Sequence, residues 1–463
     1  GSSAGNLYDR KDVHLFIDDG RRFISSTNSK FDKIVIKLVD SWAAQLAGGY
    51  ALSENYLYTV EAFKQYLQHL NGDNGMLVMV RWNIELPRLM PLVVESLRQE
   101  ETAGKKSIQD ISKQILVVED RPGLTFGSNA QRTEYPVLVI VKNSPFTSSE
   151  LDLVKQRVST NDASIIAMPG GYVQPPYDNL LSSTKRNNNG HPQQQQQEQS
   201  LSQVSYDLQK KTPFGLKPPT DDSPFYFAKE QIPKQLVLLI ETILGVSAAL
   251  ALLLVYYSRV NKIRLTASSR FHLVFVILIG LGFIFLEITF IQKFLLLLGT
   301  PIMALTVILF SILLSSGVGA YLSGRLFKKN PYKAVVISIP LLAAILLAYY
   351  VFLQDIISFS IVFQLYQRIM LTFALLSPAG LLMGFQFPSI TRMASSSNQD
   401  ITLLWGVNVI ASVIGTVLTT TSSMIIGFNG NLLVGLGLYL GALASGIAAT
   451  RITQKVSGTQ VIK

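Results

Sequence analysis

Hydrophobic and polar positions follow a short-range pattern in the first 170 residues. Short runs rich in β-branched side chains end in polar turns, which predicts strands at 13–17, 33–38, 76–82, 115–119 and 136–142. Between them, apolar residues recur three and four positions apart, which predicts helices at 57–70, 87–98 and 149–158. Strands that alternate with helices favour βαβ units, so we expect an α/β domain with a mainly parallel sheet over residues 1–170.

Residues 171–233 interrupt this pattern. They contain Asn187-Asn188-Asn189, a glutamine run at 193–197, and the proline pairs Pro175-Pro176 and Pro218-Pro219. Such a composition buries too little apolar surface to offset the entropy lost on ordering the chain. We therefore expect a low-complexity, flexible linker.

Long apolar stretches dominate residues 234–463. Seven of them reach the roughly 20 residues that a helix needs to cross a bilayer. They lie near 235–257, 271–292, 301–323, 333–353, 359–386, 402–426 and 430–450. This half is predicted to be an all-α, multi-pass transmembrane bundle in contact with the lipid bilayer.

Charge follows the same division of the chain. Residues 1–230 contain 25 Lys and Arg against 26 Asp and Glu, whereas residues 231–463 contain 15 against 4. The basic excess lies between alternate spans and after the last one, so the positive-inside rule predicts a cell-membrane protein with a cytoplasmic C-terminus. Seven spans would place the soluble half on the opposite side. Because the soluble half is balanced in charge, we predict no nucleic-acid partner.

The sequence offers no candidates for thiolate or metal chemistry. It contains no Cys. Its four His residues, His14, His69, His191 and His272, lack the spacing of metal ligands. We predict no metal site.

Acidic residues follow the first two predicted strands. Asp18 and Asp19 precede Gly20 after the first strand, and Asp40 follows the second. Ligands of open α/β sheets bind in the crevice at the carboxyl ends of the strands, where these carboxylates could hydrogen-bond a cationic or hydroxyl-rich ligand. Asp19 and Asp40 could equally cap the helices that follow. The pattern leaves both interpretations open.

Polar side chains interrupt the predicted spans at four positions. Ionisable groups inside a membrane segment are costly, so Glu287 and Arg368 are candidate functional residues. One hypothesis is that they pair across the bundle or line a polar cavity with Gln292 and Gln386. The alternative is that Glu287 packs against a hydroxyl group while Arg368 extends its charge toward the membrane surface.

Several motifs then occur in a recognisable order. The soluble half contains Gly5-Asn6-Leu7-Tyr8-Asp9, Asp18-Asp19-Gly20-Arg21-Arg22-Phe23, Phe31-Asp32-Lys33-Ile34-Val35-Ile36, Leu38-Val39-Asp40-Ser41-Trp42 and Leu52-Ser53-Glu54-Asn55-Tyr56-Leu57. The membrane half contains Glu287-Ile288-Thr289-Phe290-Ile291-Gln292-Lys293-Phe294, Met383-Gly384-Phe385-Gln386-Phe387-Pro388 and Trp405-Gly406-Val407-Asn408. In this order they resemble the membrane-fused relatives of the spermidine synthase (polyamine aminopropyltransferase) family. The resemblance implies a partial Rossmann-like domain, of the spermidine synthase and methyltransferase type.

The resemblance also implies roles for particular residues. In that family an Asp-Gly pair contacts the adenine end of decarboxylated S-adenosylmethionine, which assigns donor binding to Asp18, Asp19 and Gly20. The position of the catalytic acid falls on Lys37, and that of a second acid on Asp40. A lysine at the first position would repel a diamine unless it were desolvated. The family's Gly-rich loop and ribose-binding acid would precede Asn6, so we expect the domain to lack its N-terminal part.

These observations support three hypotheses about function. The first is a membrane-bound transferase that uses decarboxylated S-adenosylmethionine, or S-adenosylmethionine, as a co-substrate rather than as a tightly bound cofactor. The second is a small-solute transporter whose soluble part is regulatory. The third is a non-catalytic assembly subunit with a degenerate synthase domain. The expected partners are a separate N-terminal part or a second copy of the chain.

Overall fold

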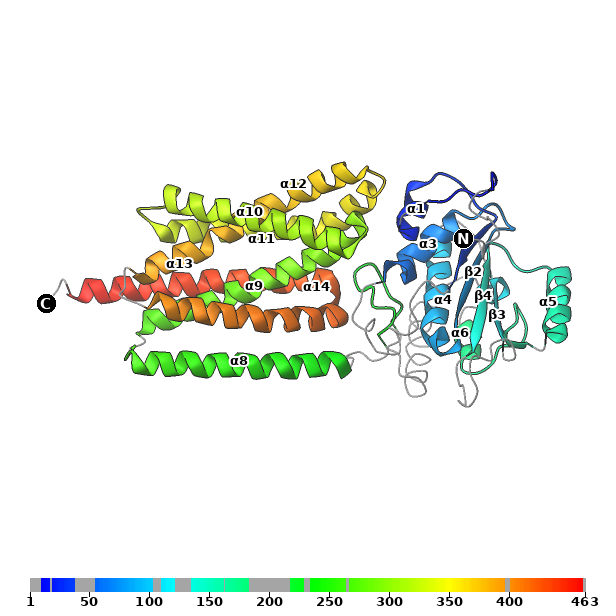
Figure 1. Cartoon of the computed structure of the whole chain (residues 1–463), viewed down its shortest axis with the longest axis horizontal. Coiled ribbons are helices and arrows are strands. Elements are labelled where there is room, and N and C mark those ends of the chain that lie inside the picture. The colour runs from blue at the N-terminus through cyan, green and yellow to red at the C-terminus, as the bar shows by residue number, and fades with distance from the viewer. Residues whose placement is uncertain are drawn as a thin grey trace.

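The protein has a sheet-containing domain at one end and a bundle of long helices at the other (Figure 1). The computed structural model describes residues 10–16, 19–37, 55–102, 110–120, 135–161, 163–182, 217–228, 234–263, 266–395 and 400–460. The C-terminus lies at the end of the bundle that points away from the sheet domain (Figure 1).

In the part of the chain that the structure describes, the sheet has five strands and is mixed. Its strands are β1 (Lys33–Ile36), β2 (Met76–Trp82), β3 (Ile115–Glu119), β4 (Pro136–Lys142) and β5 (Ser164–Ala167), in the order β1-β2-β4-β3-β5. β1 and β2 are parallel, whereas β4 is antiparallel to β2 and to β3, and β5 is antiparallel to β3. The predicted strands at 76–82, 115–119 and 136–142 are confirmed. The prediction of a mainly parallel sheet is wrong.

The parallel pairing of β1 and β2 follows from what connects them. α3 (Val60–Gln68) lies between β1 and β2 in the chain, and a crossover of this kind permits parallel pairing. The direction of β4 is set instead by its pairing with β2 and β3. Residues 13–16 form no strand, which corrects the prediction for 13–17, whose last residue lies outside the described part.

Helices cover the two faces of the sheet unequally. α3, α4 (Leu86–Thr102) and α6 (Tyr177–Ser182) lie on the face turned toward the bundle, and α5 (Ser148–Thr160) lies on the outer face (Figure 1). The apolar core forms between the sheet and the helices α3, α4 and α6. α5 buries none of its residues. α6 falls within the predicted linker but belongs to this core.

Among the described residues, six helices are long and apolar enough to cross a membrane. The membrane half contains α8 (Lys234–Val260), α9 (Ala267–Leu298), α10 (Pro301–Leu326), α11 (Pro331–Ser360), α12 (Leu365–Gly384), α13 (Gln386–Ser395) and α14 (Ile401–Gln460). α12 and α13 together form one of the six. These helices agree with a multi-pass membrane protein.

α14 folds back on itself at Gly427. This residue has φ 75° and ψ 177°, which interrupts the helix. The two arms lie side by side and run in opposite directions (Figure 1). Asn431 joins them, because its side-chain amide donates to the Thr419 carbonyl at 3.0 Å and accepts from the Ser422 hydroxyl at 2.6 Å. The last two of the seven predicted spans therefore correspond to the two arms of this one element.

Basic residues gather at the end of the bundle opposite the sheet domain. α8 starts beside the sheet domain and ends at the far side, and the connections α8–α9, α10–α11 and α13–α14 also lie there (Figure 1). These connections and helix ends carry Arg259, Lys262, Arg325, Lys328, Lys329, Lys333 and Arg392. Which side of the membrane this end faces stays a prediction of the positive-inside rule.

Candidate functional site

The predicted donor-binding and catalytic residues lie on the soluble domain, as far as the structure describes them. Asp19 caps α1 (Gly20–Ser26), since its carboxylate accepts the backbone N–H of Arg22 at 3.0 Å. Gly20 is the first residue of that helix, and both residues are exposed. Asp18 and Asp40 lie outside the described residues. The capping interpretation thus holds for Asp19, and its role toward a donor stays a prediction.

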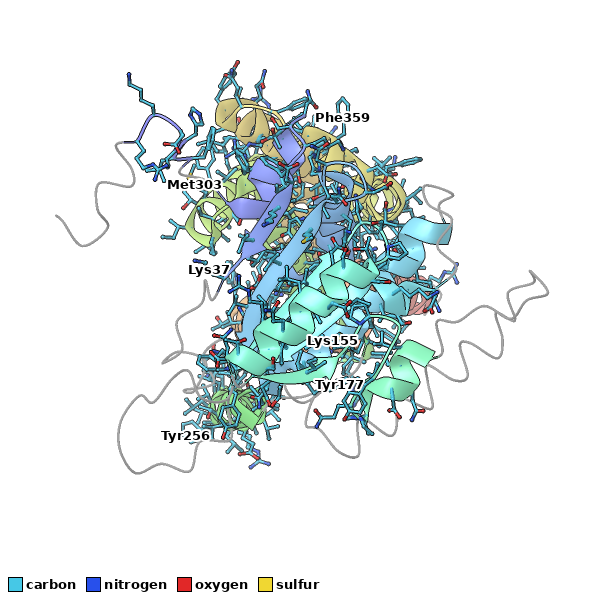
Figure 2. All side chains as sticks on the ribbon, turned by 90° about the vertical axis from the view of Figure 1, so that its right-hand side faces the viewer. Lys37, Lys155, Tyr177, Tyr256, Met303 and Phe359 are labelled. Atoms are coloured by element: carbon cyan, nitrogen blue, oxygen red, sulfur yellow. The ribbon has the colours of Figure 1, made fainter. Side chains whose placement is uncertain are left out.

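Lys37 directly follows β1 and is exposed at the edge of the sheet (Figure 2). No hydrogen bond or ion pair between described residues joins it to Asp19 or Gly20. That these residues share one site stays a prediction.

The outer edge of β1 has no partner among the described strands and carries an exposed apolar side chain. β1 is the last strand on its side of the sheet, and no other described strand pairs with it there. Val35 in β1 is 51% exposed, and Leu15 and Phe16, before α1, are 64% and 63% exposed. Phe16 packs against Phe23 with ring centroids 4.8 Å apart. Exposed apolar groups beside an unpaired strand edge are typical of a surface that another chain covers.

Residues 217–228, near the C-terminal end of the predicted linker, form a loop that packs against the sheet domain. We call this segment the docking loop. Its Asp221 accepts two hydrogen bonds of 2.5 Å from the guanidinium of Arg21 in α1. Thr59 donates its hydroxyl to the same carboxylate at 2.7 Å. The side chains of Arg21 and Asp221 are only 2% and 5% exposed. A buried ion pair needs such additional hydrogen bonds to offset the loss of water around both charges.

Glu61 adds a second acid to this buried cluster. Its carboxylate accepts the backbone N–H of Asp221 at 2.9 Å. Burial, and then the neighbouring negative charge of Asp221, raise the pKa of Glu61 to about 7. The cluster therefore contains a group that changes its charge near neutral pH.

Aromatic residues anchor the docking loop in the core of the soluble domain. Tyr226 stacks on Tyr58 with ring centroids 4.5 Å apart and donates its hydroxyl to Glu85 at 3.2 Å. Glu85 also accepts from Arg81 at 2.7 Å, and Arg81 donates to the Tyr58 hydroxyl at 2.9 Å. The guanidinium lies over the Tyr58 ring, so cation–π attraction adds to the ion pair.

Asp222 connects the docking loop to the membrane bundle. Its carboxylate lies 3.4 Å from the ammonium of Lys293 in α9 and accepts the backbone N–H of Asn429 at 2.8 Å. Its backbone carbonyl accepts the N–H of Phe428 at 2.9 Å. Asn429 and Phe428 begin the second arm of α14, where a negative charge is favourable because helix N-termini present free N–H groups. Asp222 therefore caps the second arm.

Gly427 is required at this junction for two reasons. Its positive φ is a conformation that side chains with a Cβ rarely adopt. A Cβ at this position would also come 2.1 Å from a carboxylate oxygen of Asp222. Only a glycine at position 427 therefore allows the turn of α14 to pack this closely against the docking loop.

Two further contacts complete the junction between the domain and the bundle. The Tyr56 hydroxyl donates to the backbone carbonyl of Gln292 at 2.7 Å. The rings of Phe225 and Phe428 meet edge to face, 6.0 Å apart. The soluble domain thus rests on the end of α9 and on the turn of α14.

The sequence does not reveal the docking loop as a structural element. The whole of residues 171–233 is predicted as a flexible linker because of its composition, yet the docking loop packs into both halves of the protein. The available signal is the run Asp221-Asp222-Ser223-Pro224-Phe225-Tyr226-Phe227, where three aromatic residues follow two acids. Three adjacent aromatic side chains carry enough apolar surface to order a short segment.

The two charged residues inside the predicted spans lie apart. Arg368 is 1% exposed near the start of α12, and its guanidinium donates to the Leu297 carbonyl at the end of α9. It therefore satisfies one of the carbonyls that the last turn of a helix leaves without a partner. No ion pair between described residues joins Arg368 to Glu287, which is half-buried in α9. The structure does not show the hypothesised pair across the bundle.

Gln292 and Gln386 also occupy separate places. Gln292 lies at the junction with the soluble domain, as the contact with Tyr56 shows. Gln386 is fully buried at the start of α13 and donates to the Ser338 hydroxyl at 3.3 Å. Within the described ranges, no three His, Cys, Asp or Glu side chains cluster as metal ligands would.

Comparisons of the chain with protein-family models, with curated proteins and with solved structures found no match. The resemblance to membrane-fused spermidine synthases rests on the sequence motifs alone.

Proposed function

We propose that the protein is a membrane-anchored subunit of a spermidine synthase-like transferase that uses an S-adenosylmethionine-type donor. Its donor site is completed by a strand that a second polypeptide adds at β1. The observation that carries this proposal is the outer edge of β1, which has no partner among the described strands and carries the exposed Val35.

A strand added beside β1 would pair with the backbone of this edge and cover its exposed apolar side chain. The outer side of β1 presents backbone N–H and C=O groups that a neighbouring strand can pair with. Strand addition to an exposed edge is a common mode of recognition, in which the backbone supplies affinity and alternate side chains supply specificity. The exposed Val35 would lose contact with water in the process.

The predicted donor residues are compatible with this arrangement. Asp19 is exposed although it caps α1, and a carboxylate accepts several hydrogen bonds at once. Lys37 stands at the carboxyl end of β1, where ligands of open α/β sheets bind. A strand added beside β1 would extend the sheet next to this position.

A second candidate function is that of a non-catalytic assembly subunit. Lys37 favours it, because a basic side chain then stands where the family's catalytic carboxylate would be. The transporter hypothesis has less support, since Glu287 and Arg368 lie apart in the bundle.

Isothermal titration calorimetry separates these candidates. Decarboxylated S-adenosylmethionine and S-adenosylmethionine are titrated into protein purified from its own membranes, with bound partners retained, and into the recombinant chain alone. We expect saturable binding to the first preparation, and weaker binding in an Asp19→Ala variant of it. Absence of binding to either preparation would reject the transferase and leave the assembly subunit.

A further inference from the structure

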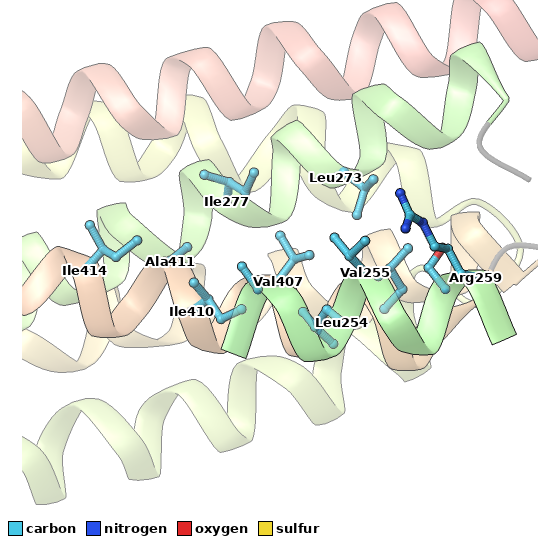
Figure 3. A pocket seen from close by; sticks show the side chains of 12 residues that line it. Leu254, Val255, Arg259, Leu273, Ile277, Val407, Ile410, Ala411 and Ile414 are labelled. Atoms are coloured by element: carbon cyan, nitrogen blue, oxygen red, sulfur yellow. The ribbon is translucent and has the colours of Figure 1, made fainter. Parts of the chain in front are cut away.

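A pocket opens on the side of the bundle between α8, α9 and the first arm of α14 (Figure 3). Its volume is about 540 Å³. Apart from Ser258 and Arg259, every lining side chain is apolar. Ile414 lies at one end of the pocket and Arg259 at the other (Figure 3).

The pocket has the length of one leaflet of a membrane. Along the first arm of α14 its lining runs from Leu403 to Ile414, which corresponds to roughly 16 Å at 1.5 Å per residue. Half of a bilayer's hydrocarbon core is about 15 Å thick. An acyl chain that enters the pocket would therefore lie beside the helices over the depth of a single leaflet.

α8 forms one wall of the pocket and stands apart from the other helices. Only 11% of its most apolar stretch is buried, against 50% for α9. Near the far end of α8, the Tyr257 hydroxyl donates to Asp400 at 3.1 Å and fixes the helix to the start of α14. α8 is thus attached beside the charged end of the pocket, while an apolar space remains between the helices.

Charge distinguishes the two ends of the pocket. Arg259 is exposed, and it belongs to the basic end of the bundle with Lys262 and Arg270. Basic residues at the mouth of an apolar crevice between transmembrane helices bind the phosphate of anionic lipids. The apolar interior excludes a free phosphate ion or a polar solute as the main occupant.

We propose that this pocket is a binding site for one anionic glycerophospholipid from the leaflet on the basic side of the bundle. One acyl chain occupies the apolar pocket, and Arg259 donates hydrogen bonds to the phosphate. The bound lipid fills the space between α8 and the bundle. This proposal is independent of the transferase function.

Photolabelling in lipid nanodiscs tests the site directly. The full chain is placed in nanodiscs of equal parts phosphatidylglycerol and phosphatidylcholine, which carry a trace of either lipid with a diazirine on its acyl chain. Labelled peptides are then identified by mass spectrometry. We expect phosphatidylglycerol to label residues 251–259 and 403–414 about fivefold more than phosphatidylcholine, since one basic residue contributes about 1 kcal/mol toward an anionic lipid. Equal labelling by both lipids would overturn the assignment of the headgroup.

Two variants with matched controls test the two parts of the site. Ala251→Trp places a ring in the pocket and should reduce labelling of residues 403–414 at least fivefold. Leu252→Trp adds the same ring at the next position of α8, which is 70% exposed and outside the lining, and should leave that labelling unchanged. Arg259→Gln should remove the preference for phosphatidylglycerol, whereas Arg325→Gln, on α10, should retain it. Unchanged labelling in Ala251→Trp would overturn the site itself.

Discussion

Arg21 and Asp221 form a bidentate ion pair although they lie 200 positions apart in the chain. The pair closes the docking loop over α1 and α3, and the next residue, Asp222, contacts the membrane bundle. Two adjacent acids of the docking loop therefore connect the two parts of the protein. Asp221 contacts the sheet domain and Asp222 contacts the membrane bundle.

Asp221→Ala should destabilise the soluble domain by about 3–5 kcal/mol, because it leaves the guanidinium of Arg21 buried without a counter-charge. Thermal unfolding in detergent, followed by the fluorescence of the half-buried Trp82 in β2, measures the loss. Asp12→Asn removes an acid from the exposed pair with Arg10 and serves as the control, since surface pairs contribute little. An equal effect of both variants would contradict the role of the docking loop.

The double variant Arg21→Leu/Asp221→Leu tests whether an uncompensated buried charge causes the loss of stability in Asp221→Ala. Replacing both charges removes the uncompensated group, so the loss should be smaller than in Asp221→Ala. A loss as large as the single variant would indicate that the contacts with Thr59, rather than the ion pair, hold the loop.

Stability should fall as pH rises from about 4.5 toward 7. The folded protein raises the pKa of Glu61 from its ordinary value of 4.5 to about 7, so the native state binds more protons than the unfolded state between these values. The contribution is complete below the unfolded pKa and is lost as Glu61 ionises. Unfolding midpoints measured from pH 4 to 8 should show this slope, and Glu61→Gln should flatten it. An unchanged slope in Glu61→Gln would assign the titration to another group.

Gly427→Ala should disrupt the turn of α14 and its contact with the docking loop. The substitution combines a strained positive φ with a Cβ that overlaps the Asp222 carboxylate, and strain of this kind costs about 1–3 kcal/mol before the overlap is added. Gly437→Ala is the control, because a Cβ there meets nothing within 4 Å. It should be neutral or mildly stabilising, since Ala favours a helix over Gly. Size-exclusion profiles after heating compare the two.

Exchanging the charges of Glu287 and Arg368 should not restore what the single changes lose. Arg368 donates to the end of α9 and not to Glu287, so Arg368→Glu places a carboxylate against a backbone carbonyl. The yield of folded protein from membranes should be as low for Glu287→Arg with Arg368→Glu as for Arg368→Glu alone. Rescue by the exchange would restore the hypothesis of a pair across the bundle.

The sequence predicts local elements better than it predicts how they assemble. The strand at 76–82 is visible because its side chains alternate and polar turns bound it, and the structure agrees. The direction of β4 depends on its pairing with β2 and β3, and no local pattern encodes that pairing. The turn at Gly427 is a similar case, because its glycine is recognisable only with Asp222 in place.

The site shows the same limit. The sequence allows Asp19 either to cap a helix or to bind a ligand. The structure shows that it caps α1, and this role does not exclude a ligand. Asp221 and Asp222 fall in a stretch whose composition predicts flexibility, because their partners Arg21 and Lys293 are distant in the chain. Contacts over such separations are set by the tertiary structure.

Photo-crosslinking from Val35 tests the central claim that β1 receives a strand from a second polypeptide. A benzophenone amino acid is placed at Val35, on the open edge, and at Lys155, on α5 of the outer face, and intact membranes are irradiated. We expect a covalent adduct to another chain, or to a second copy, from Val35 and none from Lys155. Adducts from Val35 only within its own chain, or none at all, would contradict the claim.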